Sequence, residues 1–227
     1  MSTRNGDYLS RVEVDPEGPI RSVVIWLHGL GADGHDFEPV VPFLGIDRAL
    51  GVRFVFPHAP SIPVTVNAGM VMPAWYDIRM PALKRDVDEA GVRESAERIR
   101  SLLARERERG VPADRIVMAG FSQGGAVALH VALRYPERLA GVLALSTYLV
   151  CEESLLAERS EANLDVPIFQ AHGTDDPMVP IRNGESTRDR LLEMGYPVVW
   201  RSYPMGHEVR PEEIRDIGAA LTRMLDR

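Results

Sequence analysis

Short apolar runs alternate with helical patterns along most of this chain. The runs are VVIWL at residues 23–27, FVF at 54–56, IVMA at 116–119, VLAL at 142–145, IFQA at 168–171 and VVW at 198–200. Strands that are apolar on both faces belong in a parallel sheet that helices cover. Helical patterns lie at about 86–109, 124–135, 184–194 and 211–225. The alternation predicts an α/β fold with a doubly wound, mostly parallel sheet and right-handed crossovers.

Two segments depart from this alternation. In YLSRVEV, Val12 and Val14 alternate with charged residues, which predicts an edge strand that pairs antiparallel. Residues 57–81, PHAPSIPVTVNAGMVMPAWYDIRMP, are rich in proline, methionine and aromatics and follow neither a helical nor a strand period. We expect a long irregular loop there, and loops of this length are usually functional.

The composition bounds the number of domains and the partners. A chain of 227 residues fits one sizeable α/β domain, and because no linker or repeat divides it, residues 1–227 are expected to form a single domain. The net charge is −7, with acidic and basic residues interspersed. This charge pattern disfavours nucleic acid and anionic membrane surfaces as partners.

The sequence also indicates the cellular compartment. The N-terminal residues contain no apolar signal segment, no run approaches the roughly 20 apolar residues of a membrane span, and no lipidation motif is visible. The single cysteine, Cys151, cannot form an internal disulfide, which fits a reducing compartment. A cytoplasmic protein without a membrane anchor is therefore expected.

Ser122 lies in the pattern Gly-x-Ser-x-Gly of the segment AGFSQGGA, between an expected strand and an expected helix. The pattern alone is common in turns, but a tight strand-to-helix turn holds such a serine above the sheet as a nucleophile. The flanking Gly120 and Gly124 let the turn close. Ser122 is therefore a candidate nucleophile.

A serine nucleophile needs a base and an acid that orients the base, and in this type of fold both follow the nucleophile along the chain. His207, after the last expected strand, is the only histidine beyond His172 and hence the candidate base. Asp175 and Asp176 in HGTDDP are both candidate acids, and spacing does not separate them. His172 precedes them at a strand end, where a structural role is expected.

The reaction also requires donors for the oxyanion that forms on the substrate. The first long strand is followed by HGLGADGHD, whose glycines allow the backbone to approach a ligand closely. The backbone N–H groups of Leu30 and of Gln123, the residue after the nucleophile, are the expected pair.

Two other kinds of function compete with a serine hydrolase. One is a binding protein that retains a hydrolase-like fold without turnover, against which the complete set of reactive residues argues. The other is a metal-dependent hydrolase that uses His28, Asp33, His35 and His58 as ligands. Histidines in glycine-rich loops are more often structural, so the expected protein holds no metal and needs no cofactor.

Seven segments, in order along nearly the whole chain, resemble the carboxylesterase and phospholipase type 2 family of α/β-hydrolases, which includes acyl-protein thioesterases and bacterial carboxylesterases. They are WLHGLGADGHDF, FPHAPSIPVTVNAGMVMPAWYDI, DEAGVRESAERI, AGFSQGGAVALH, LALSTYL, HGTDDPMVP and YPMGHEVRPEEI. The resemblance implies the α/β-hydrolase fold and a triad of Ser122, Asp176 and His207. It thereby selects Asp176, directly before Pro177, over Asp175.

The resemblance also implies a substrate site. In this family the segment that corresponds to PVTVNAGMVMPAWYD lies beside the acyl-binding cleft, which makes Met70, Met72 and Trp75 candidate lining residues. Small-molecule carboxylic esters are the expected substrates, with acyl thioesters and lysophospholipids as further members of the class. HGLGADGHDF looks more like the bacterial branch, which favours small esters over acyl-protein substrates. Family members often form dimers, so a homodimer is left open.

Overall fold

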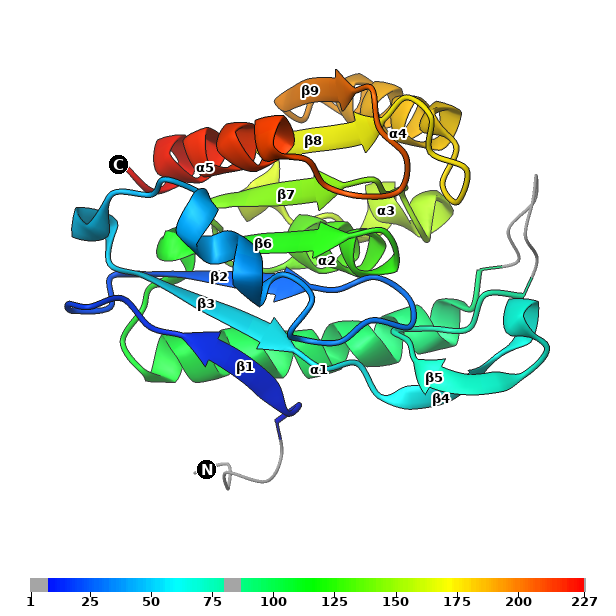
Figure 1. Cartoon of the computed structure of the whole chain (residues 1–227), viewed down its shortest axis with the longest axis horizontal. Coiled ribbons are helices and arrows are strands. Elements are labelled where there is room, and N and C mark those ends of the chain that lie inside the picture. Colours follow the sequence, from blue (N-terminus) through cyan, green and yellow to red (C-terminus); the bar gives the residue numbers. More distant parts are fainter. Residues whose placement is uncertain (1–7, 80–86, 227) are drawn as a thin grey trace.

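A seven-stranded sheet forms the centre of the molecule (Figure 1). The computed structural model describes residues 8–79 and 87–226. The strand order is β1 (Arg11–Val14), β3 (Val52–Pro57), β2 (Ser22–Leu27), β6 (Ile116–Phe121), β7 (Gly141–Leu145), β8 (Ile168–Gly173) and β9 (Val198–Tyr203). Only β1 is antiparallel to its neighbour. The predicted mostly parallel sheet with an antiparallel edge strand is confirmed.

Helices cover both faces of this sheet. The longer helices are α1 (Glu89–Glu108), α2 (Gln123–Arg134), α3 (Glu152–Glu158), α4 (Ile181–Glu193) and α5 (Pro211–Leu225). The apolar residues of α1 and α2 belong to one core layer, and those of α5 belong to the layer on the opposite face, where α5 lies in front of the sheet in Figure 1. Four of these helices were predicted from periodicity, with ends within five residues; the start expected at residue 86 lies outside the described residues. The short α3 was missed.

Alternation along β6 explains why its sequence is a continuous apolar run. Ile116 and Met118 point into the layer of α1 and α2, whereas Val117 and Ala119 point into the layer of α5. All four side chains are fully buried. Because both faces of a covered parallel sheet are apolar, the alternation is invisible in the sequence.

The irregular loop expected between residues 57 and 81 is instead largely a β-hairpin; residues 80 and 81 lie outside the described residues. Strand β4 (Ser61–Val64) pairs antiparallel with β5 (Met70–Pro73), and the turn between them begins with a short 3-10 helix, η3 (Thr65–Asn67). Proline cannot donate to a strand ladder, so the prolines at positions 63 and 73 mask the strands in the sequence. The loop prediction was wrong because an isolated two-stranded ribbon tolerates proline on its open edges.

Four further 3-10 helices connect the elements. They are η1 (Glu38–Phe43), η2 (Arg48–Leu50), η4 (Ala113–Arg115) and η5 (Glu161–Asn163). Within residues 8–79 and 87–226, none of the helices combines the length and apolar character that crossing a bilayer requires.

The carboxyl ends of the parallel strands meet at one edge of the sheet. The segments that follow β2, β6, β8 and β9 therefore lie together, at the right-hand side of Figure 1. In open α/β sheets ligands bind outside this edge. The fold thus gathers Leu30, Ser122, Asp176 and His207, which are far apart in the sequence, into one neighbourhood.

One buried carboxyl group makes the stability of the fold depend on pH. Glu213 in α5 is 0% exposed, and burial raises the pKa of its carboxyl to about 8, with Asp216 adding repulsion. Because this folded-state pKa exceeds the unfolded value, the neutral carboxyl contributes stability that is complete below about pH 4.5 and is lost as the pH rises through about 8.

We therefore expect Glu213→Gln to leave the free energy of unfolding nearly unchanged at pH 5 and to raise it by several kcal/mol at pH 9. Urea denaturation of both proteins at the two pH values measures this. Glu212→Gln, which changes the exposed neighbouring carboxyl, is the matched control. An equal effect of Glu213→Gln at both pH values would contradict the assignment.

Candidate active site

Ser122 occupies a strained position between β6 and α2. Its φ is 54° and its ψ is −121°, a region that non-glycine residues rarely adopt. The Ser122 N–H donates to the carbonyl of Leu145 at 2.8 Å, and the Thr147 hydroxyl donates to the carbonyl of Ser122 at 2.6 Å. These two hydrogen bonds hold the strained residue against the neighbouring strand.

Two glycines make the tight turn possible. A Cβ on Gly120 would lie 2.4 Å from the backbone of Gly124, and a Cβ on Gly124 would lie 2.4 Å from the carbonyl oxygen of His28. Both distances are far shorter than any carbon contact, and the obstructing atoms are backbone. The close approach of α2 to the ends of β2 and β6 therefore requires glycine at both positions.

His207 and Asp176 are hydrogen-bonded. The Nδ1–H of His207 donates to Oδ2 of Asp176 at 2.7 Å, and Oδ1 of Asp176 accepts from the N–H groups of Met178 and Val179, each at 2.8 Å. Burial by itself would raise the pKa of Asp176, but the bond from His207 and the backbone donors outweigh it and lower that pKa. The buried carboxylate is thus held charged beside the imidazole.

The two adjacent aspartates, between which spacing in the sequence did not decide, have different environments in the structure. Asp176 is 6% exposed and faces His207, whereas Asp175 is exposed and accepts a hydrogen bond from Thr174 at 3.0 Å. His172 is fully buried below them, and its Nε2–H donates to the carbonyl of Val179 at 2.7 Å. Burial lowers the pKa of His172, so the neutral ring braces the loop that carries Asp176.

Ser122 and His207 line one cavity of about 410 Å³ at the carboxyl edge of the sheet. The ring of His207 packs against that of Phe121 with 4.7 Å between their centroids. The remaining lining residues are mostly apolar and come from five segments of the chain. They are Gly29, Leu30, Ala32, Asp36, Val66, Asn67, Met72, Ile78, Phe121, Gln123, Tyr148, Met178 and Val179.

The two expected oxyanion donors border the same cavity. Gln123 is the first residue of α2, so its backbone N–H has no carbonyl partner within the helix. Leu30 lies in the turn after β2, where the next residue, Gly31, has a φ of 77° and donates its N–H to the carbonyl of Pro73 at 2.8 Å. The hairpin thereby anchors the turn that carries Leu30.

The side chain of Gln123 has a role that the sequence did not indicate. It is 1% exposed, its Oε1 accepts from the N–H of Trp75 at 2.9 Å, and its Nε2 donates to the carbonyl of Tyr76 at 2.7 Å. This pair of bonds ties the segment after the hairpin to the turn that holds Ser122. A glutamine beside a serine carries no sequence signal for such a tertiary bridge.

Of the three residues expected to line an acyl cleft, the structure brings only Met72 to the cavity that contains Ser122. Met70 is 63% exposed on β5. Trp75 is 2% exposed in the core, where its Nε1–H donates to the carbonyl of His28 at 2.9 Å. Met72 directly precedes Pro73, whose carbonyl accepts from Gly31 beside Leu30, whereas Met70 lies at the other end of β5 and Trp75 lies in the core beyond the hairpin.

The residues considered as metal ligands are engaged in other contacts. His28 donates from Nδ1–H to the carbonyl of Gly29 at 2.7 Å and accepts at Nε2 from the N–H of Ala59 at 3.0 Å. His35 Nδ1 lies 2.7 Å from Glu38, and His58 Nδ1 accepts from a backbone N–H at 3.1 Å. In the part of the chain that the structure describes, no three such side chains are grouped to hold a metal ion.

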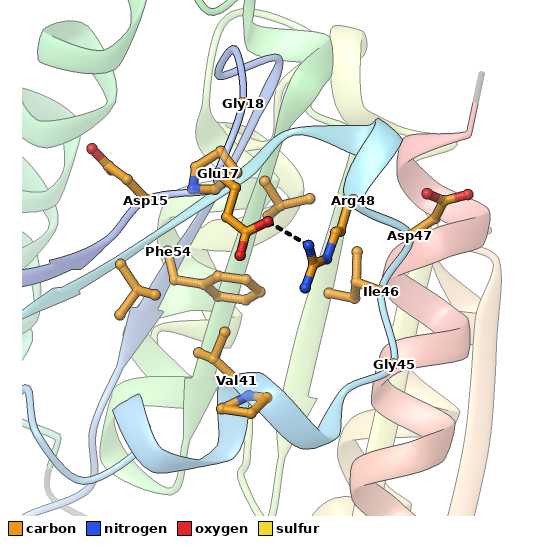
Figure 2. Close-up of a pocket in the computed structure, with 13 residues that line it drawn as sticks. Asp15, Glu17, Gly18, Val41, Gly45, Ile46, Asp47, Arg48 and Phe54 are labelled. Atoms are coloured by element: carbon orange, nitrogen blue, oxygen red, sulfur yellow. Dashed lines mark hydrogen bonds and ion pairs between the residues drawn. The ribbon is translucent and has the colours of Figure 1, made fainter.

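A second and larger cavity, of about 620 Å³, lies at the amino end of β3, away from Ser122. Figure 2 shows Phe54 and Val41 on its walls and an ion pair between Glu17 and Arg48 across it. Its lining contains no serine, histidine or cysteine. The smaller cavity is therefore the candidate active site on chemical grounds, despite its size.

Comparison with known proteins identifies the family of the chain. The sequence profile of the Phospholipase/Carboxylesterase family matches residues 10–225. Acyl-protein thioesterase 1 of Neurospora crassa is 45% identical over 213 residues, which cover 90% of this chain and 87% of that protein. Acyl-protein thioesterase 1 of Gibberella zeae is 37% identical over 213 residues, which cover 90% and 91% of the two chains.

Solved structures show the same architecture. Arabidopsis thaliana SOBER1 superposes with a TM-score of 0.85 at 32% identity, over 90% of this chain and 99% of that one. Zea mays acyl-protein thioesterase 2 gives a TM-score of 0.85 at 29% identity, over 96% and 100% of the two chains. The fold is thus the predicted α/β-hydrolase fold, and the chain belongs to the phospholipase/carboxylesterase family of hydrolases.

Proposed function

We propose that this serine hydrolase of carboxylic esters and thioesters acts through a triad of Ser122, His207 and Asp176. The observation that carries the proposal is the 2.7 Å hydrogen bond between His207 and the buried Asp176, at a cavity that His207 shares with the strained Ser122. A nucleophile, a base and a buried orienting acid together make up the machinery of acyl transfer.

The reaction begins when Ser122 Oγ attacks the carbonyl carbon of the substrate while His207 Nε2 takes the hydroxyl proton. The tetrahedral intermediate collapses, the bond to the leaving alcohol or thiol breaks, and His207 returns the proton to that group. Water then attacks the acyl carbon while His207 accepts one of its protons. The bond to Ser122 Oγ breaks, His207 returns the proton to Oγ, and the carboxylic acid leaves.

Asp176 fixes the tautomer of His207 in this scheme. A carboxylate on Nδ1–H leaves Nε2 free to accept the serine proton, and its charge stabilises the imidazolium that forms. The lowered pKa of Asp176 keeps the carboxylate ionised through the cycle. The N–H groups of Leu30 and Gln123 donate to the oxyanion, which bears full charge only in the tetrahedral intermediate.

The substrate class follows from the cavity lining and from the relatives. Val66, Met72, Ile78 and Tyr148 form an apolar wall that suits a short or medium acyl chain. Three of the four proteins named above are called acyl-protein thioesterases, so acyl thioesters join small carboxylic esters as proposed substrates. We further propose that the partner of the protein is a small-molecule substrate and that the protein is cytoplasmic. A homodimer is the assembly to test.

Substitution of the nucleophile is the most direct test. We expect Ser122→Ala to lower kcat for p-nitrophenyl butyrate and for a butyryl thioester by about 10⁴ to 10⁶-fold, because no other group can form the acyl-enzyme. A fluorophosphonate probe should label the wild type and leave this variant unlabelled. Turnover near the wild-type rate in Ser122→Ala would refute the mechanism, and an unlabelled wild type would favour a binding protein without turnover.

The two neighbouring aspartates provide a matched pair. Asp176→Asn should lower kcat about 10³ to 10⁴-fold, since the amide no longer selects the required tautomer of His207 or stabilises its charge. Asp175→Asn, which changes an exposed side chain of the same type, should remain within about threefold of wild type. Steady-state kinetics on one ester decide between them, and the reverse ranking would assign the acid to Asp175.

The two side-chain hydrogen bonds of Gln123, here called the Gln123 bridge, lead to a separate prediction. Gln123→Met keeps the backbone N–H and the side-chain volume but removes the acceptor of the buried Trp75 N–H and a donor to the Tyr76 carbonyl, at a cost of about 2–4 kcal/mol of unfolding free energy. Urea denaturation measures that loss. KM for butyryl esters should rise more than kcat falls, and unchanged stability would show that the bridge contributes nothing.

A further inference from the structure

Asp36 is an acidic group in the candidate active site that the proposed mechanism does not use. It lines the cavity that contains Ser122 and His207. The residue is exposed, and its backbone N–H donates to the carbonyl of Asp33 at 3.1 Å. Among residues 8–79 and 87–226, the carboxylate has neither a hydrogen-bond donor nor a cation as a partner.

A series of ring contacts connects Phe37, the residue after Asp36, to His207. Asp36 directly precedes Phe37, and the ring of Phe37 lies 5.6 Å from that of Phe121. The ring of Phe121 lies 4.7 Å from that of His207. The apolar residues Val66, Met72 and Ile78, by contrast, come from the hairpin and the segment after it.

The two sides of the cavity meet different parts of a substrate. In acyl transfer the histidine returns its proton to the leaving group, so the leaving alcohol or thiol departs on the side of His207. The acyl chain then lies along the apolar side. We assign Asp36, which lines the same cavity as His207, to the leaving-group side.

We infer that Asp36 selects substrates whose leaving alcohol or thiol carries positive charge close to the scissile bond, and disfavours anionic leaving groups. The inference rests on the proposed function and adds the charge of the leaving group to it. Burial, followed by repulsion from Asp33, raises the pKa of Asp36. Within residues 8–79 and 87–226 the carboxylate has no cationic partner, and a cationic leaving group would supply one.

The expected size of the effect follows from Coulomb's law. For unit charges about 6 Å apart at an effective dielectric constant of about 40 to 80, the rate ratio between a cationic and a neutral substrate is about three- to tenfold. An anionic substrate should fall below the neutral one by a similar factor. Salt should weaken both effects because the carboxylate is open to solvent.

Three thioesters that share a butyryl group test the inference. They are S-butyrylthiocholine, which is cationic, its neutral isostere S-(3,3-dimethylbutyl) thiobutyrate, and the anionic S-butyryl-3-mercaptopropionate. For the wild-type protein, kcat/KM should decrease in that order, and the ratio of cationic to neutral substrate should fall between 20 mM and 500 mM NaCl. Asp36→Asn should reduce that ratio by about three- to tenfold.

Asp33→Asn is the matched control, because it removes the same charge from a neighbouring exposed position outside the cavity lining. We expect it to shift the ratio by less than about twofold. A ratio unchanged in Asp36→Asn, or shifted equally by Asp33→Asn, would overturn the inference. Turnover of the neutral thioester by Ser122→Ala distinguishes failure of this inference from failure of the proposed function. If that variant shows no turnover, the triad mechanism stands even where the inference about Asp36 fails. If it turns the thioester over, the mechanism itself fails.

Discussion

The positive φ of Ser122 is the constraint around which the rest of the site is arranged. A non-glycine residue in this region costs on the order of 1–3 kcal/mol, so the surrounding structure must enforce it. The hydrogen bonds to Leu145 and from Thr147, together with the glycine contacts at the start of α2, supply that enforcement. Contacts with the ends of β7 and β2 thus hold the strained backbone, and the serine is fixed rigidly above the sheet.

The buried ionisable groups of the site differ in their charge. Asp176 remains charged in the interior because three donors meet its two oxygens. Burial instead lowers the pKa of His172 and of His28, whose rings hydrogen-bond only uncharged backbone groups. Among these three buried groups, charge is concentrated on the one carboxylate that faces His207. The neutral buried histidines stabilise the loops and carry no charge that would compete with His207 for the Asp176 carboxylate.

The sequence predicted the parts of the protein that depend on local pattern. Apolar runs and helical periodicity indicated the strands of the sheet and four helices, and the strand-turn-helix context singled out Ser122. The hairpin was missed because prolines hide its strands. The Gln123 bridge, the burial of Trp75 and the position of Asp36 arise only when distant segments meet, and a single sequence has no period that encodes such contacts. For the same reason spacing could not separate Asp175 from Asp176.

The attachment of the hairpin has a consequence for how the enzyme can diversify. Its base is fixed by the bond between Gly31 and Pro73 and by the Gln123 bridge, while Met70 and Val71 near its turn are more than 60% exposed. Mutations of Met70 and Val71 therefore alter exposed apolar surface with little effect on the turn that holds Ser122, whereas mutations at the base affect both. Selection can reshape the outer hairpin in small steps while the machinery of acyl transfer stays intact.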